Sequence, residues 1–197
     1  MRICFVGDSF VNGIGDPDCL GGAGRGGAAA QQDGHDVTYY NLGVRRETSA
    51  DIRGRWEREV SCRLPEGSDG RVVFSFGVND TTLEGDSPRV DFSDSIENAR
   101  QVLDLASQSY PTLMIGPPPT SDADQNTRIA RLSDGFAPVC GELGIPYLDV
   151  FASLQASGVW TSEAAAKDGA HPRAGGYSEM AQLVQVWPGW LSWFIIK

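Results

Sequence analysis

Short apolar runs typical of strands alternate along this chain with segments of helical spacing, and no other feature of the sequence limits the fold as much. The strand-like runs lie at residues 2–6, 36–42, 72–76, 112–115 and 146–150. Strands that alternate with helices form a parallel sheet with helices packed on both faces. For five such strands the expected order is 2-1-3-4-5. We therefore predict an α/β fold of three layers, α/β/α, around a five-stranded parallel sheet.

Four segments between the strands place apolar residues at helical spacing, namely residues 48–64, 92–109, 126–143 and 174–194. The first begins with Thr48 and Asp51 in the positions of a capping box. The last is predicted to bend at Pro188-Gly189. Residues 19–34 are a weaker case, because five glycines lower helix propensity before the run Ala28-Ala29-Ala30-Gln31-Gln32 raises it. We expect a loop there that turns into a short helix.

Length and charge set broad limits on the class of protein. A chain of 197 residues suits one domain, spanning 1–197, and the formal net charge of -10 argues against a nucleic-acid partner. The local basic clusters are Arg45-Arg46 and residues 53–58. Acids interrupt the second cluster, which is interpreted as a solvated helix face. Because Met1 leads straight into the first strand and no apolar stretch could span a membrane, we expect a cytoplasmic protein without a signal peptide. The sequence is compatible with a homo-oligomer and leaves the oligomeric state open.

The four cysteines do not indicate a metal site. Cys4, Cys19, Cys62 and Cys140 are widely spaced, and no C-x-x-C pair occurs. Free thiols are the default expectation, with one disulfide left open, and Cys4 is predicted to be a small core residue in the first strand.

A glycine pattern raises the question of a nucleotide cofactor. Gly22-x-Gly24-x-x-Gly27 matches the form of the dinucleotide fingerprint, but it does not directly follow a strand and lies in a glycine-rich stretch that produces the pattern by chance. We therefore expect no cofactor. A binding module that holds a phosphate or nucleotide on this stretch is kept as the alternative to an enzyme.

Ser9 is the first candidate for catalysis. It belongs to Gly7-Asp8-Ser9-Phe10, which follows the first strand, so it lies at the carboxyl edge of the sheet, where open α/β proteins bind ligands. A nucleophilic serine needs a base, an acid that orients the base, and donors for the developing oxyanion.

Two histidines are available as the base. His35 lies in a polar turn before the second strand and is predicted to be exposed, away from Ser9. His171 lies between a polar loop and the final helix, and Asp168 three residues earlier can fold back to accept a hydrogen bond from the ring. The alternative, that Asp168 and His171 only cap the last helix, is equally compatible with the spacing.

Two further residues at strand ends suit an oxyanion site. Asn79 follows the third strand in Gly77-Val78-Asn79-Asp80, where its amide could donate to an oxyanion, although Asn-Asp after a strand is often only a turn. Gly43 ends the second strand, where the missing side chain lets a backbone N–H approach a ligand. A plain strand-to-loop glycine is the alternative there.

These residues together resemble a known family. Gly7-Asp8-Ser9, Gly43, Gly77-x-Asn79-Asp80 and Asp168-x-x-His171-Pro172 are similar, in order, to the four motifs of the SGNH hydrolases, also called the GDSL esterase/lipase family. The resemblance implies a flavodoxin-like domain with Ser9 as nucleophile, His171 as base and Asp168 as the residue that orients it. It also implies an oxyanion hole made by the Ser9 and Gly43 N–H groups and the Asn79 side chain, without a metal or organic cofactor.

The resemblance does not choose the substrate. Phe10 stands where the family name has leucine, and Gly21-Gly22-Ala23-Gly24 occupies a stretch where many relatives carry an aromatic residue. The departure affects the acyl-side pocket and leaves the catalytic set complete. We expect a serine esterase of lipase type that cleaves carboxylic esters of short or medium acyl groups as small-molecule substrates. Carbohydrate O-deacetylation is the alternative within the family.

Overall fold

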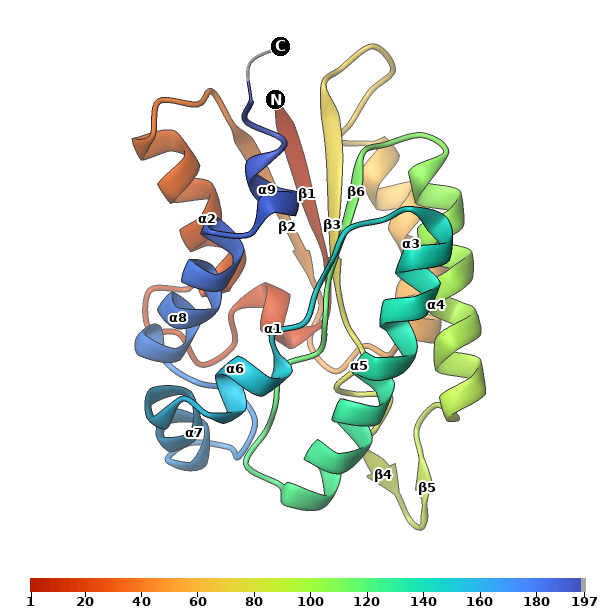
Figure 1. Cartoon of the computed structure of the whole chain (residues 1–197), viewed down its shortest axis with the longest axis vertical. Helices are drawn as coiled ribbons and strands as arrows, with labels where there is room; N and C mark the ends of the chain where they lie inside the picture. Colours follow the sequence, from red (N-terminus) through yellow and green to blue (C-terminus); the bar gives the residue numbers. More distant parts are fainter. Residues whose placement is uncertain (196–197) are drawn as a thin grey trace.

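The computed structural model describes residues 1–195, and its main sheet is the one predicted from the alternation of strands and helices. The strands are β1 (Arg2–Gly7), β2 (Thr38–Gly43), β3 (Gly70–Ser75), β6 (Thr112–Ile115) and β7 (Tyr147–Leu148). All neighbours are parallel in the order β2-β1-β3-β6-β7, which confirms the predicted topology (Figure 1). Gly7 pairs with Gly43 on one side and Ser75 on the other, so the three strands end level with one another.

Helices cover both faces of this sheet and complete the three layers. On one face lie α2 (Gly21–Gln32), α8 (Ala174–Gln185) and α9 (Pro188–Leu191), and on the other α3 (Ser49–Ser61), α4 (Phe92–Ser107) and most of α5 (Ala123–Leu143) (Figure 1). Successive residues of β1 point to opposite faces, so Ile3 and Phe5 enter one apolar core while Cys4 and Val6 enter the other. Cys4 is therefore a core residue, as predicted.

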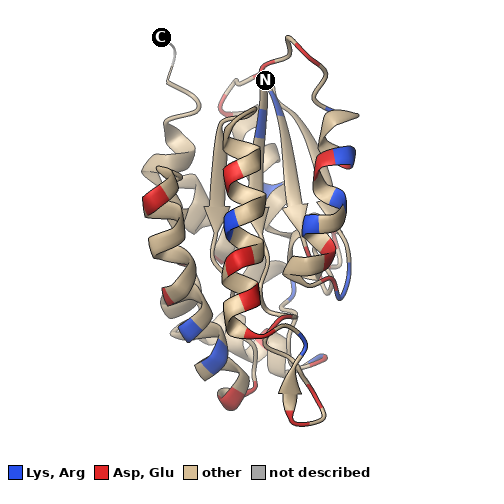
Figure 2. Cartoon of the chain, turned by 90° about the vertical axis from the view of Figure 1, so that its right-hand side faces the viewer, with Lys and Arg blue, Asp and Glu red and all other residues tan. Residues whose placement is uncertain are grey.

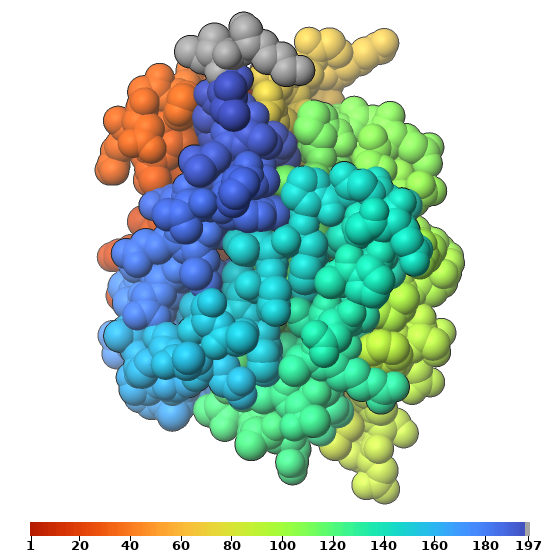
Figure 3. Space-filling view, viewed as in Figure 1, coloured from red at the N-terminus to blue at the C-terminus, as the bar shows by residue number. Residues whose placement is uncertain are grey.

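Four short elements were not predicted. They are α1 (Ser9–Asn12), α6 (Phe151–Gln155), α7 (Gly158–Ala165) and the hairpin of β4 (Leu83–Glu84) with β5 (Ser87–Pro88). Helices α6 and α7 connect the last strand to α8, and Figure 3 shows this segment filling the surface between α5 and α8.

The predicted helix caps explain where two helices begin. Thr48 Oγ1 accepts a hydrogen bond from the Asp51 N–H, and Asp51 Oδ2 accepts one from the Thr48 N–H, which is the predicted capping box of α3. Helix α5 begins at Ala123, three residues earlier than expected, because the Asp122 side chain caps it by accepting from the Gln125 N–H at 2.8 Å.

The glycine-rich stretch is helical from Gly21 onward, so the prediction of a loop in its first half is wrong. Tertiary contacts outweigh the low helix propensity of glycine: a Cβ on Gly27 would lie 3.1 Å from the Tyr39 ring, so glycine is what lets α2 lie close to β2. The Asp16 carboxylate also accepts hydrogen bonds from the N–H groups of Leu20 and Gly21 at the start of the helix. Gly22, Gly24 and Gly27 therefore lie inside a helix and do not form the strand-to-helix turn of a dinucleotide site.

The C-terminal helix breaks earlier than predicted. Helix α8 ends at Gln185, and Pro188 is the first residue of α9 rather than the site of a bend. A residue before proline avoids the helical region, and Trp187 accordingly has extended torsions, φ -76° and ψ 127°. The last predicted strand is also shorter than expected, because only Tyr147 and Leu148 pair with β6.

Acidic and basic residues share the outer helix faces. Helix α4 carries Arg100 between Glu97 and Asp104 in the sequence. Figure 2 shows blue and red segments mixed along the helices of the face that it presents. The four cysteines are free, with Cys4 and Cys140 buried and Cys19 and Cys62 exposed. Within residues 1–195, none of the helices has both the length and the apolar character required to cross a bilayer.

Candidate active site

Ser9 lies in the turn that joins β1 to α1, and the last residue of β1, Gly7, has to be glycine. A Cβ on Gly7 would lie 2.0 Å from the Ser75 carbonyl oxygen, so only glycine fits between β1 and β3. Asp8 caps α1 by accepting from the Phe10 N–H at 2.9 Å, which makes Ser9 the first residue of the helix. The serine is 3% exposed.

His171 and Asp168 reach Ser9 from the loop between α7 and α8. His171 Nε2 lies 2.7 Å from Ser9 Oγ, and His171 Nδ1 lies 2.7 Å from Asp168 Oδ2. The other carboxylate oxygen accepts from the backbone N–H groups of Ala170 and His171. The interpretation as helix caps alone is wrong, since the three side chains form one continuous hydrogen-bonded series.

The surroundings of Asp168 keep it ionised. Partial burial opposes the charge, but the hydrogen bonds from the His171 N–H, the His171 ring and the Ala170 N–H outweigh it and lower the pKa of Asp168 to about 2. A carboxylate that is charged at neutral pH can fix the tautomer of the ring and stabilise an imidazolium beside it.

The His171 ring is held between neighbours that leave little freedom. Phe10 packs on it with ring centroids 4.8 Å apart, and Trp160 in turn stacks on Phe10. Gly15 has φ +99°, and a Cβ there would lie 2.4 Å from the Pro172 carbonyl oxygen, so the 14–16 loop lies directly against the His171-Pro172 backbone. The Tyr177 hydroxyl donates to the Ile14 carbonyl and holds this loop in place.

Asn79 and Gly43 also lie at this edge of the sheet. Asn79 Nδ2 donates to the Glu47 carbonyl at 2.9 Å and, over a longer distance of 3.4 Å, to Asp8 Oδ2. Gly43 packs so closely on α1 that a Cβ would lie 2.2 Å from the Asn12 nitrogen. Its N–H donates to Asn41 Oδ1 at 3.0 Å, so any other acceptor must share or replace that bond.

Asp8 is a buried carboxyl beside Ser9 that the sequence analysis did not single out. It is 1% exposed, and burial, with smaller contributions from Asp80 and Glu47, raises its pKa to about 7 despite the hydrogen bond from Phe10. Near neutral pH a large fraction of this group is therefore uncharged, which limits the negative charge next to Ser9.

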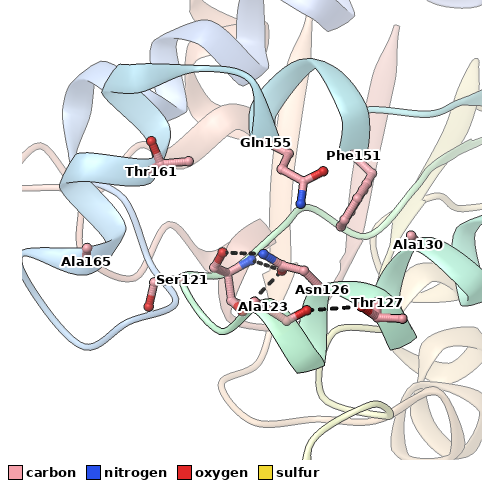
Figure 4. A pocket seen from close by; sticks show the side chains of 10 residues that line it. Ser121, Ala123, Asn126, Thr127, Ala130, Phe151, Gln155, Thr161 and Ala165 are labelled. Atoms are coloured by element: carbon pink, nitrogen blue, oxygen red, sulfur yellow. Dashed lines mark hydrogen bonds between the residues drawn. The ribbon is translucent and has the colours of Figure 1, made fainter.

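A cavity of about 590 Å³ opens beside the Asp168–His171 loop. It lies between the start of α5 and helices α6 and α7 (Figure 4). Ser121 joins its rim to the loop, since the Ser121 N–H donates to the Gly169 carbonyl at 2.7 Å. Thr120 and Asn126 are already hydrogen-bonded to each other, whereas the Gln155 side chain extends into the cavity (Figure 4).

The side chains of His35 and Arg55 are less exposed than predicted. The prediction that His35 is exposed is wrong, because its ring packs on Phe194 with centroids 4.6 Å apart and is half-buried. It takes no part in the hydrogen-bonded series at Ser9. Arg53 and Arg58 are exposed as predicted, but the interpretation as solvated surface is wrong for Arg55, whose side chain points inward and is 16% exposed. Its partners are carbonyls at the ends of β1 and β2, which no local pattern in α3 could reveal.

A parallel α/β sheet with a Ser-His-Asp series at its carboxyl edge defines a serine hydrolase. The family model described as GDSL-like lipase/acylhydrolase matches residues 5–178, so the chain belongs to this family of serine acylhydrolases and esterases.

Solved structures agree with the fold. The lipase/acylhydrolase from Enterococcus faecalis is 21% identical with a TM-score of 0.75, covering 93% of this chain and 92% of that one. The acetylxylan esterase Axe2 from Geobacillus stearothermophilus is 16% identical with a TM-score of 0.75, covering 100% and 94%. A lipolytic protein of the G-D-S-L family from Desulfitobacterium hafniense is 22% identical with a TM-score of 0.74, covering 92% and 96%. Among curated protein sequences, none matches significantly.

Proposed function

We propose that this protein hydrolyses carboxylic esters of short or medium acyl groups through an acyl-serine intermediate. In this proposal Ser9 is the nucleophile, His171 the general base and Asp168 the residue that orients it. The observation that carries the proposal is the pair of 2.7 Å distances that join Asp168 to His171 and His171 to Ser9. The small exposed fractions of Ser9 and His171, 3% and 7%, favour a compact acyl group beside them.

The proposed reaction proceeds in two steps of acyl transfer. As Ser9 Oγ forms a bond to the ester carbonyl carbon, His171 Nε2 takes the hydroxyl proton, and the carbonyl oxygen becomes an oxyanion. Collapse breaks the bond to the leaving alkoxide, which receives the proton from His171. Water then attacks the acyl-serine while His171 takes its proton, and cleavage of the acyl–Oγ bond returns that proton to Ser9.

The oxyanion is proposed to bind the Ser9 N–H, the Gly43 N–H and Asn79 Nδ2. Asn79 Nδ2 donates one N–H to the Glu47 carbonyl and the other, at 3.4 Å, to Asp8 Oδ2, so an oxyanion would share or replace the longer bond. The raised pKa of Asp8 reduces the charge that would oppose an oxyanion here. The Gly43 N–H would share or exchange its bond to Asn41 Oδ1.

Replacing Asn79 with alanine should therefore lower kcat by about 10²- to 10³-fold, with a much smaller change in KM, because the donor acts on charge that develops in the transition state. Steady-state kinetics on a soluble aryl ester measure this. Asn98→Ala is the matched control, since Asn98 is a buried asparagine that donates to Ser49 Oγ. An Asn79→Ala enzyme with unchanged kcat would remove Asn79 from the oxyanion site.

A second candidate, removal of acetyl groups from a carbohydrate, is favoured by the cavity of about 590 Å³, which has room for a sugar. Its lining is more apolar than polar, but it carries the hydrogen-bonding side chains of Ser121, Gln155 and Thr161. Axe2, which shares the fold, is described as an acetylxylan esterase.

An ester panel separates the two functions. Aryl acetate, butyrate and octanoate are compared with acetylated xylo-oligosaccharides at equal enzyme concentration. A simple esterase should show the highest kcat/KM on the short aryl esters, whereas a deacetylase should release acetate from the acetylated sugar about tenfold faster or more, a margin that specific leaving-group contacts readily supply. A folded protein that hydrolyses none of these esters would contradict both proposals.

A further inference from the structure

Arg55 connects the ends of two strands that lead into the candidate site. From helix α3 its Nη2 donates to the Gly7 carbonyl at 3.1 Å and to the Leu42 carbonyl at 2.9 Å. Gly7 is the last residue of β1, two residues before Ser9, and Leu42 directly precedes Gly43. One guanidinium therefore ties together the backbone segments that carry two of the proposed oxyanion donors.

Glu47 extends the same network to the third donor. Its carboxylate accepts from Arg55 Nε at 2.6 Å, and its backbone carbonyl accepts from Asn79 Nδ2 at 2.9 Å. Arg55 is 16% exposed and Glu47 17% exposed, so solvent screens their ion pair only in part. The planar guanidinium suits this task, because it offers several donors in fixed directions at once.

We infer that Arg55 and Glu47 are positioning residues that assemble the oxyanion hole of the proposed esterase from three separate chain segments. The inference rests on the proposed function and adds to it the residues that hold the donors in place. Donors that are oriented before the reaction need no rearrangement as charge develops, and this is the main source of their effect.

A second effect follows from the peptide unit between Leu42 and Gly43. The carbonyl that Arg55 binds belongs to the same peptide group as the Gly43 N–H. A cationic donor on the carbonyl oxygen polarises that group and makes its N–H a stronger donor, as in other hydrogen-bonded chains. Arg55 thus contributes charge to the oxyanion site through the backbone without touching the substrate.

The test replaces Arg55 with lysine and with alanine and measures kcat per active site, counted by covalent labelling with a fluorophosphonate. Lysine keeps the charge but cannot reach Glu47 and both carbonyls in the fork geometry. We expect Arg55→Lys to lower kcat about 10- to 100-fold with KM nearly unchanged, because a shift of about 1 Å in groups that act on the reacting atoms can cost about 10²-fold. Glu47→Gln should lower kcat in the same way, and the double variant should lose less than the product of the two single effects.

Arg63, in the turn just beyond the end of α3, provides the matched control. It pairs with Glu59, the acid that also accepts from Arg55, but its own hydrogen bond goes to the Glu59 carbonyl, away from the site. Arg63→Ala should keep the full kcat per labelled serine. Guanidinium ion at concentrations far below denaturation should restore part of the activity of Arg55→Ala, and none of that of Asn79→Ala.

Three outcomes are distinguishable. If Arg55→Lys and Arg55→Ala lose only thermal stability and keep kcat per labelled serine, Arg55 stabilises the fold without affecting catalysis, and the inference is overturned. Equal losses in Arg63→Ala would also overturn it, because the effect would then not be specific to the hydrogen bonds that Arg55 makes at the strand ends. If the unmodified protein is not labelled at all, the result contradicts the proposed function itself, and with it the inference about Arg55.

Discussion

Replacing Ser9 with alanine is expected to lower kcat by about 10⁴-fold or more, because the nucleophile of both half-reactions is removed while the oxyanion donors remain. His171→Ala should cost a similar factor, since the two residues act as one unit whose effects do not add. The unmodified protein should gain the mass of one adduct after exposure to a fluorophosphonate, and neither variant should gain it. Intact mass spectrometry gives this result without a known substrate.

The chain offers a matched serine as control. Ser133 is buried like Ser9 and contacts a phenol and a carboxylate, Tyr147 and Asp149, but no imidazole. Ser133→Ala should keep both the adduct and the activity. An adduct that persists on Ser9→Ala would mean that another residue is the nucleophile, and a folded native protein without any adduct would contradict the assignment of Ser9.

The parts of this protein that could be predicted from the sequence are those that depend on local pattern. The order of the sheet follows from strands that alternate with helices, since right-handed crossovers leave few topologies. The capping box at Thr48 and Asp51 needs only residues three apart, and it was predicted correctly. The carboxyl ends of parallel strands meet at one edge, so Ser9 and Asn79 could be placed together from their positions after strands.

The parts that were missed depend on contacts between distant segments. Helix α2 is stable despite its glycines because they let it lie against Tyr39, and nothing within residues 21–27 indicates that neighbour. Arg55 looks like one charge among several on an exposed helix, yet its partners Gly7 and Leu42 are 48 and 13 residues away. The raised pKa of Asp8 could not be predicted from the sequence either, because it comes from burial that only the assembled fold provides.

Replacing Asp168 with asparagine is expected to lower kcat by about 10⁴-fold while the fold and the position of the ring are retained. The asparagine oxygen can still accept from the His171 N–H, but an amide NH₂ that faces Nδ1 forces the proton of the ring onto Nε2. That nitrogen would then donate to Ser9 Oγ and could not accept its proton. Asp122→Asn is the control, since Asp122 caps the start of α5 and asparagine caps as well as aspartate does.

The acid limb of the stability curve gives an independent readout of the same carboxylate. Its folded pKa of about 2 lies below the ordinary value of 3.8, so its contribution to stability is present above about pH 4 and is lost as the pH falls towards 2. Urea unfolding between pH 4 and pH 2 should therefore show a shallower loss of stability in Asp168→Asn than in the unmodified protein. Equal slopes would mean that the hydrogen bonds to Asp168 do not favour its ionised form.

Comparison with Asp168→Ala separates the two ways in which this carboxylate could assist the base. Alanine removes the charge as asparagine does, but it imposes no tautomer on the ring. If tautomer control dominates, Asp168→Ala should retain more activity than Asp168→Asn at neutral pH. If stabilisation of the imidazolium dominates, the two variants should be equally slow. Loss of a triad carboxylate is expected to cost far more than tenfold in kcat. A kcat within about tenfold of the unmodified enzyme in either variant would therefore exclude Asp168 as the orienting residue.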